Sequence, residues 1–204
     1  MHYISIKNRI KSKIDRLFNI DRSHEFGYKA KNAFIADDAI IFNKRNLFLY
    51  ENTSIPEGAI ILNPRSKFIM KRGSFSSYNL CVCPGNHMPL VGKWKREVTD
   101  AIKDVVDTEK KFDKDIIVEE DVWIGINVTL LNGAHIGRGC IVGAGCVVSG
   151  EWPPYAIIAG NPAHVIRFLF SIDDIIKHEE VLYKPEDRIP RNMIEKNFKD
   201  FGVL

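Results

Sequence analysis

Residues 117–150, IVEEDVWIGINVTLLNGAHIGRGCIVGAGCVVSG, carry a six-residue repeat. An aliphatic residue stands at every sixth position from Val118 to Val148, and a small or slender residue follows the first five of them four positions later. A period of six fits neither the 3.6-residue period of a helix nor the alternation of an ordinary strand. Six residues suffice for one short strand and one sharp corner, so three units form a triangular coil of about 18 residues.

Stacking of these coils predicts the core. Residues 18 positions apart lie over one another, so Val122 is expected over Cys140 and Val128 over Cys146. Glycines between them supply the positive backbone dihedral angles that tight corners need. Each coil pairs with the next as a parallel sheet, which predicts an all-β solenoid.

The repeat continues upstream less regularly. Leu49, Ile55 and Ile61 keep the spacing, and after a slip of two residues we expect Ile69, Phe75 and Cys81 to resume it. Residues 34–47 are expected to form a ragged first coil. Residues 88–114 lack the repeat and predict a long excursion from one corner, a feature that is usually functional or mobile.

The flanks predict helices. Residues 4–18 place Ile10, Ile14 and Leu17 on one face of a basic amphipathic helix, which either caps the solenoid or lies on an anionic membrane surface. Ser171 is a candidate N-cap for a helix, and Pro185 and Pro190 precede a second helix around 191–201. We therefore expect a helical segment at 1–33, the solenoid at 34–168 and a C-terminal helical extension at 169–204.

Composition excludes several classes of protein. The 204 residues include 29 Lys and Arg against 26 Asp and Glu, a net charge of +3, and 45% are hydrophobic. Such a chain is neither disordered nor a dedicated nucleic-acid binder. The sequence shows neither a long apolar run typical of a spanning helix nor the apolar region of a secretory signal, so a cytoplasmic location is expected. The four cysteines form no C-x-x-C pair and are expected to be small buried hydrophobes without metal.

The stretch from 117 to 167, with V-W-I-G, V-G-A-G, P-P-Y and A-G-N-P-A, closely resembles the hexapeptide-repeat acyltransferases. These proteins have a left-handed parallel β-helix, and the left hand is implied by the resemblance, since parallel crossovers are otherwise right-handed. The resemblance also implies a homotrimer with acetyl-CoA sites between neighbouring subunits. The family includes sugar O-acetyltransferases, xenobiotic acetyltransferases and serine acetyltransferase.

A general base is expected at His87. Deprotonation of an attacking hydroxyl suits histidine, whose pKa lies near neutrality. His87 stands in CVCPGNHMPLV, just before the excursion, where similar acetyltransferases carry their catalytic histidine. His135, by contrast, occupies the last place of a hexad and is expected to face solvent.

The resemblance implies the remaining site residues. The donor groove is expected to be bordered by Trp123, Ile126, Ala144, Ser149, His164 and Arg167. Many relatives carry Lys where this chain has Gly150, and Lys or Arg where it has His164, so some phosphate contacts are expected either to be missing or to come from Lys93, Lys95 and Arg96 in the excursion. Contacts with the acceptor are assigned to Ser74, Ser76 and Asn79, which otherwise complete corners.

The leading hypothesis is an acetyl-CoA-dependent O-acetyltransferase acting on a sugar or polysaccharide precursor. A serine-type or xenobiotic acceptor is the alternative within the enzyme class. A γ-type carbonic anhydrase would need two histidines about five residues apart, and the sequence has no such pair. A non-catalytic trimeric scaffold is the third hypothesis, against which an intact His87 speaks.

Overall fold

Three parallel β-sheets enclose the core of this protein. The computed structural model describes residues 6, 10, 11, 13, 14, 17 and 23–202. Sheet A contains β1 (Tyr28–Lys29), β4 (Leu47–Leu49), β7 (Phe68–Met70), β10 (Ile116–Val118), β13 (His135–Ile136) and β16 (Glu151–Trp152). Sheet B contains β2 (Phe34–Ile35), β5 (Ser54–Ile55), β8 (Phe75–Ser76), β11 (Trp123–Ile124), β14 (Ile141–Val142), β17 (Ala156–Ala159) and β18 (His164–Phe168). Sheet C contains β3 (Ile40–Ile41), β6 (Ile60–Ile61), β9 (Cys81–Cys83), β12 (Thr129–Leu131) and β15 (Val147–Val148).

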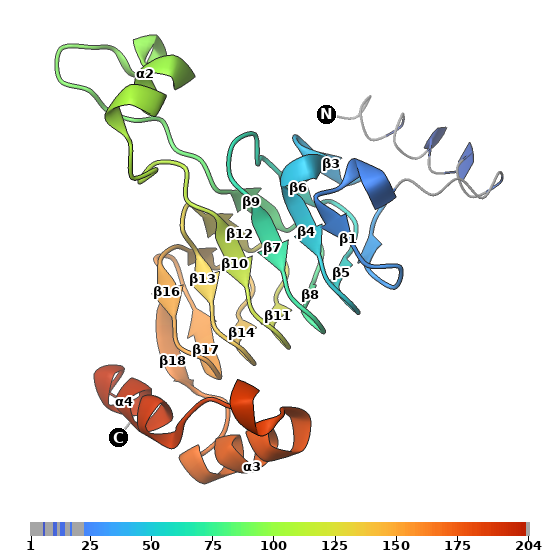
Figure 1. The fold of residues 1–204 in the computed structure, drawn as a ribbon, viewed down its shortest axis with the longest axis vertical. Coiled ribbons are helices and arrows are strands. Elements are labelled where there is room, and N and C mark those ends of the chain that lie inside the picture. The colour runs from blue at the N-terminus through green and yellow to red at the C-terminus, as the bar shows by residue number, and fades with distance from the viewer. Residues whose placement is uncertain (1–5, 7–9, 12, 15–16, 18–22, 203–204) are drawn as a thin grey trace.

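The chain visits the sheets in the order A, B, C and builds the solenoid in Figure 1. Every strand pairing is parallel except that of β17 with β18, which is antiparallel. Trp123 pairs with Ile141 and Thr129 pairs with Val147, which stacks the predicted core residues on one another. Val122, Val128, Cys140 and Cys146 are all fully buried. The predicted parallel β-helix is therefore confirmed.

Coil length varies along the solenoid. The paired positions in sheet B are Phe34, Ser54, Phe75, Trp123, Ile141 and Ile157, so successive coils contain 20, 21, 48, 18 and 16 residues. Only one of these intervals matches the 18 residues of three regular hexads.

The extra residues gather at one edge of the prism. We call the corner that follows each strand of sheet C the C–A edge, and the corner that precedes it the B–C edge. Buried residues lie six apart across the other corners, but Ile61 and Met70 are nine apart and Val82 and Val118 are 36 apart across the C–A edge. The 48-residue coil results from an excursion at this same edge.

The sequence prediction for the third coil was wrong by one residue. Met70, Ser76 and Val82 point into the core, whereas Phe75 is 44% exposed and Ile69 and Cys81 face outward. The corner after Ile61 contains three extra residues instead of two. A shift of one residue moves every side chain of a strand to the opposite face of the sheet.

The excursion projects from the solenoid at the upper left of Figure 1. It leaves after β9, contains η3 (Lys95–Glu97) and α2 (Asp100–Val106), and returns to β10. Thr99 caps α2 by accepting a hydrogen bond from the backbone N–H of Ile102. Sheets A, B and C continue across this interruption without losing their pairing.

Two C-terminal helices follow the last coil at the bottom of Figure 1. They are α3 (Ile172–Leu182) and α4 (Arg191–Asp200), with η4 (Pro185–Asp187) between them. The Ser171 side chain accepts from the N–H of Asp174, which confirms the predicted N-cap. Phe198 of α4 stacks on Phe168 with a centroid distance of 3.9 Å, so this end of the core is covered by the helices.

The N-terminal part of the described chain holds η1 (Ser23–Glu25) and β1, and η2 (Lys44–Asn46) lies at the C–A edge. The helix predicted over residues 4–18 falls largely outside the described residues. None of the helices among those residues is long and apolar enough to cross a membrane.

Candidate active site

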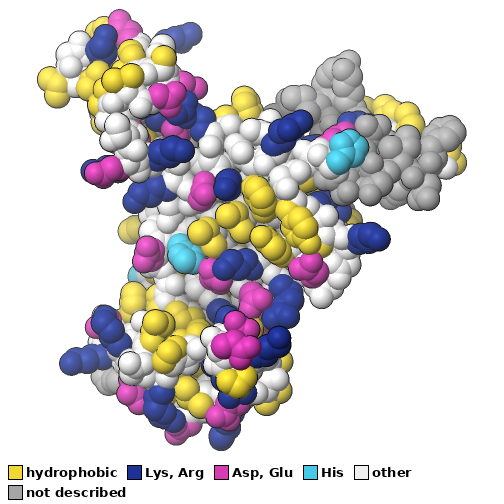
Figure 2. All heavy atoms as spheres, viewed as in Figure 1, with side chains coloured by type: hydrophobic (Ala, Val, Ile, Leu, Met, Phe, Trp, Pro, Cys, Tyr) yellow, Lys and Arg dark blue, Asp and Glu magenta, His cyan; other side chains and the backbone are white. Residues whose placement is uncertain are grey.

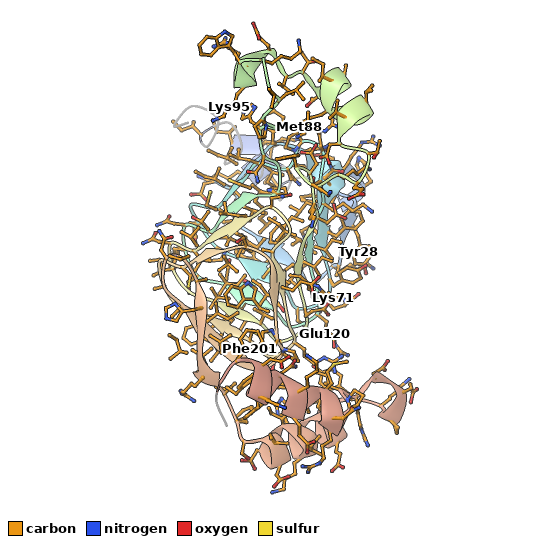
Figure 3. The ribbon with its side chains drawn as sticks, turned by 90° about the vertical axis from the view of Figure 1, so that its left-hand side faces the viewer. Tyr28, Lys71, Met88, Lys95, Glu120 and Phe201 are labelled. Carbon is orange, nitrogen blue, oxygen red and sulfur yellow. The ribbon has the colours of Figure 1, made fainter. Side chains whose placement is uncertain are left out.

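His87 lies at the base of the excursion, on the C–A edge. Gly85 forms an antiparallel bridge with Asp113, and the N–H of Asn86 donates to the carbonyl of Phe112 at 2.7 Å. His87 itself is exposed, while the neighbouring Met88 is 3% exposed and lies where the excursion leaves the solenoid (Figure 3). The imidazole is therefore carried by a segment whose backbone is anchored directly before it, at Gly85 and Asn86.

A buried lysine fixes this turn. Lys103 Nζ donates to the carbonyl oxygen of Asn86 at 2.9 Å and lies 2.8 Å from Asp113 Oδ2. Arg65 Nε donates to the same carboxylate oxygen at 2.9 Å. A buried ammonium group is tolerated where a carboxylate and further hydrogen bonds compensate its lost hydration. Because Lys103 belongs to α2, it ties the excursion to the backbone adjacent to His87.

The expected donor groove falls partly on sheet B. Trp123, Ile141, Ile157 and Arg167 occupy paired positions on four neighbouring strands, so they form one outward-facing row along the solenoid. Trp123 is 45% exposed. Strands lie about 4.8 Å apart, so the row measures roughly 14 Å from indole to guanidinium. The row offers an apolar track that ends in a cation.

Other expected donor contacts lie on the B–C edge beside this row. Ile126 and Ala144 are exposed at equivalent corners of successive coils. A side chain at Gly125 would lie 2.7 Å from the backbone nitrogen of Ala144, so this corner requires glycine for close stacking of the coils. His164 is exposed at the start of β18, with Nδ1 3.4 Å from the carbonyl oxygen of Pro162.

Ser149 lies elsewhere, on the C–A edge that also carries His87. It is exposed, and its carbonyl accepts from the indole N–H of Trp152 at 3.0 Å. The expected site residues therefore divide between two edges of one chain, with sheet C between them. In the coil that contains β12, this strand of three residues lies between the two edges.

The residues assigned to the acceptor have different surroundings. Ser74 is buried, donates to the carbonyl of Glu119 at 2.5 Å and accepts from the N–H of Val122 at 3.0 Å. Ser76 is 5% exposed, and its hydroxyl has no partner among the described residues. Asn79 is exposed, adopts a φ of 60° and donates to Asn127 Oδ1 at 2.9 Å. Of these three residues, only Asn79 reaches the surface.

His135 and the two cysteines of β9 have structural surroundings. His135 Nε2 lies 3.0 Å from Glu119 Oε1 on the outer face of sheet A, where Lys71 also contacts Glu119. Cys81 and Cys83 face outward from β9 with their sulfur atoms 3.7 Å apart. Burial, together with Cys81, raises the pKa of the Cys83 thiol to about 11. The described part of the chain contains no cluster of three potential metal ligands.

Sequence reasoning missed the pairing of Lys103 with Asp113. These residues lie in a segment without a repeat, so no spacing rule indicates that they meet. Their burial depends on how the excursion folds back on Gly85.

Comparison with known proteins identifies the repeat. Residues 115–150 match the family model described as bacterial transferase hexapeptide (six repeats). The resemblance to hexapeptide-repeat acyltransferases is thereby confirmed, and the solenoid agrees with their left-handed parallel β-helix.

Individual relatives and structures extend this comparison. A probable macrolide acetyltransferase from Lysinibacillus sphaericus is 41% identical over 64 residues, which are 31% of this chain and 36% of the relative, so the match spans about a third of either protein. A hexapeptide-repeat acetyltransferase from Vibrio cholerae, solved with acetyl coenzyme A, superposes with a TM-score of 0.62 and 19% identity over 81% of this chain and 87% of that one. A maltose O-acetyltransferase from Clostridium difficile gives a TM-score of 0.57 and 21% identity over 82% and 89% of the two chains. At these identities the structures establish the fold.

Proposed function

We propose that this protein is an acetyl-CoA-dependent O-acetyltransferase that acetylates a hydroxyl group of a sugar or polysaccharide precursor. The observation that carries the proposal is His87, exposed on an anchored turn at the edge of a hexapeptide solenoid. Matches to a macrolide acetyltransferase and to acetyltransferases of the same fold support acetyl transfer.

His87 acts as the general base. Its imidazole accepts the hydroxyl proton while the oxygen attacks the thioester carbonyl, and it gives this proton to the thiolate sulfur of CoA as the C–S bond breaks. A positioned base of this kind contributes roughly a hundredfold to ten-thousandfold to the rate. No group of the described chain donates to or accepts from the ring of His87, so we assign its orientation to the bound substrates or to a neighbouring subunit.

The donor lies along Trp123, Ile141 and Ile157, with its phosphates near Arg167 and His164. An apolar track suits a pantetheine arm, and an arginine at its end suits a nucleotide phosphate. Ile126 and Ala144 border this track on the B–C edge, and Ser149 contacts the donor from the C–A edge of a neighbouring chain.

Each active site needs residues from two subunits, and a trimer provides three such sites. His87 and the donor track lie on different edges of one chain, on either side of sheet C. A cyclic trimer brings the C–A edge of one subunit against the B–C edge of the next and repeats this contact three times. We therefore propose a homotrimer with one active site between each pair of subunits.

The sugar acceptor is supported by structural similarity to a maltose O-acetyltransferase. A xenobiotic acceptor is the second candidate, because the macrolide acetyltransferase shares the higher sequence identity, although over only 31% of this chain. Asn79 is the exposed member of the expected acceptor contacts. We place the protein in the cytoplasm, where acetyl-CoA is available and its four free cysteines stay reduced.

Release of free thiol from acetyl-CoA tests this function. Sugars, nucleotide sugars, serine and aromatic drugs are offered as acceptors to the wild type and to His87→Ala and His87→Gln. We expect turnover with a saccharide, and a loss of at least about a hundredfold in kcat for both variants. Calorimetry with CoA and native mass spectrometry should show unchanged donor affinity and trimer mass. Retained turnover in both variants contradicts the assignment of the base, and failure of every acceptor class favours a scaffold.

A further inference from the structure

A charged cleft lies beside the turn that carries His87, and we propose that it binds a phosphate group of the acceptor. The acceptor is then a phosphorylated or nucleotide-linked sugar. This inference rests on the proposed function for the identity of the acceptor, but the phosphate site itself is testable without turnover.

The cleft is formed where the excursion returns to the C–A edge. It has a volume of about 540 Å³ and is lined by Asn46, Arg65, Lys67, Glu109, Lys110, Asp113, Lys114 and Asp115. One wall comes from the corners before β4 and β7, and the other from the returning limb before β10. This volume falls within the range of about 300–1,000 Å³ that is common for small-molecule sites.

The ion pairs in the cleft leave an excess of positive charge. Asp113 is neutralised by Arg65 and Lys103, and Glu109 Oε2 lies 2.9 Å from Lys111 Nζ. Arg65 also contacts Asp100 and Asp104, so its guanidinium is fully engaged.

Three ammonium groups remain for a ligand. Lys67, Lys110 and Lys114 are exposed, and none of them lies within ion-pair distance of a carboxylate in the described part of the chain, although Lys67 Nζ lies over the Phe48 ring at 5.5 Å from its centroid. The one carboxylate that opposes them is Asp115, which accepts from the backbone N–H of Lys67 at 2.7 Å. A site with three lysines that lack a carboxylate partner and one such carboxylate favours an anion with several acceptor oxygens, which is the chemistry of a phosphate ester.

The position of the cleft identifies its occupant as the acceptor. Arg167 and His164, which we assign to the donor, lie on β18 at the C-terminal end of the solenoid. The cleft involves Asn46, Arg65 and Lys67, which belong to earlier coils than His87. His87 therefore lies between the two regions, as a base that joins donor and acceptor must.

The distance from the base is compatible with one sugar. Gly85 pairs with Asp113 of the cleft, and His87 follows Gly85 by two residues. A cross-strand step and two residues of chain place His87 within roughly 12 Å of Asp113. We place the phosphate among the lysines that line the cleft with Asp113, and a hydroxyl of the sugar near the imidazole.

Calorimetric titration at low ionic strength tests the site directly. The probes are galactose, galactose 1-phosphate, UDP-galactose and CoA, each titrated without a reaction partner. The cleft variant is Lys67→Gln/Lys110→Gln/Lys114→Gln. The control is Lys177→Gln/Lys184→Gln/Lys199→Gln, which removes the same charge from exposed positions of the C-terminal helical extension.

We expect the wild type and the control to bind at least one phosphorylated probe about tenfold or more tightly than galactose, and the cleft variant to lose this preference. The affinity for CoA should stay the same in all three proteins. Equal binding of phosphorylated and plain sugar by the wild type, or an unchanged preference in the cleft variant, overturns the proposal. Loss of CoA affinity in the cleft variant also overturns it, because the phosphate would then belong to the donor. Binding of sugar phosphates by a protein that never releases thiol would refute the proposed function and leave the phosphate site standing.

Discussion

The ammonium nitrogen of Lys103 lies 2.8 Å from Oδ2 of Asp113, and both side chains are almost fully buried. The same nitrogen donates to the carbonyl of Asn86, one residue before His87. A single buried ion pair thus connects α2, the returning limb of the excursion and the segment that carries His87.

Lys103→Met should therefore reduce both stability and turnover. Removing one partner of a buried pair costs about 3–5 kcal/mol, which urea unfolding measures. A displaced His87 should lower kcat by on the order of ten- to a hundredfold. The KM for acetyl-CoA should stay unchanged, because the donor track lies on another edge. Lys177→Met, an exposed helical lysine, is the matched control, and wild-type kcat in folded Lys103→Met would contradict the positioning role.

Glu179 should hold the C-terminal helices against the solenoid. It is 1% exposed, and it accepts from the hydroxyl of Tyr155, from Arg138 at 2.8 Å and from the N–H of Ile189 at 3.0 Å. Burial, reinforced by the hydrogen bond to Glu179, raises the pKa of Tyr155, so this tyrosine remains a donor at neutral pH. Glu179→Ala should lower the free energy of unfolding by about 3–5 kcal/mol.

The adjacent Glu180 provides the control for this experiment, since it is exposed and one residue away. Glu180→Ala should change the free energy of unfolding by less than about 0.5 kcal/mol. Equal losses in the two variants would show that the buried network does not stabilise the junction.

Mixed trimers should regain activity if the site lies between subunits. His87→Ala removes the base on the C–A edge, and Ala144→Trp fills the donor track on the B–C edge. Each variant alone should be inactive. In trimers assembled from equal amounts of both, about a quarter of the sites combine an intact His87 with an intact Ala144 from the neighbouring chain. Thiol release at about that fraction of the wild-type rate is expected, whereas inactivity of confirmed mixed trimers would place both residues in one chain's site.

Glu119 should make part of the stability depend on acid pH. Burial acts to raise the pKa of Glu119, but hydrogen bonds from Lys71 and His135 prevail and lower it below the ordinary value of 4.5. Since the folded pKa lies below the unfolded one, the ionised group stabilises the fold above pH 4.5, and this contribution disappears as the pH falls through the folded pKa. Glu119→Gln should lose on the order of 0.5–1 kcal/mol at pH 7.

Urea unfolding at several pH values between 7 and 3 measures this contribution. The difference between Glu119→Gln and the wild type should narrow toward the acid end. Glu151→Gln, exposed on β16 and two strands away in sheet A, should show no such trend. A constant difference across the range would mean that ionisation of Glu119 does not contribute.

The sequence predicted the solenoid where the coils are regular. From Val118 to Val148 the buried residues follow one another at six-residue intervals, so spacing alone determines which side chains face inward. The same rule misplaced Ile69, Phe75 and Cys81, because a corner with three extra residues and one with two differ by a single step. Corner length depends on turn geometry, which the spacing of aliphatic residues does not predict.

The site was predictable only in part. Motifs and resemblance indicated His87, Trp123 and Arg167, and the strand pairing brings Trp123 and Arg167 onto one row. The ion pair of Lys103 with Asp113 and the cleft near Lys110 depend on contacts between the two limbs of the excursion. No periodic pattern in the sequence predicts these contacts. Figure 2 shows a further feature that the hexads did not indicate, an apolar patch over sheet A. Tyr28 of β1 and Tyr50, which follows β4 in the same sheet, are both exposed, and their ring centroids lie 4.9 Å apart.

The C–A edge, whose corners differ in length, is the part of this fold that tolerates insertions. Phe68 pairs with Ile116 although 48 residues separate them. The excursion can therefore be lengthened, shortened or exchanged without changing the strand pairing on either side of it. The other two edges have no such freedom, since their corners keep one length throughout. Variation in the excursion can therefore change the surface around His87, while the paired strands of the solenoid stay the same.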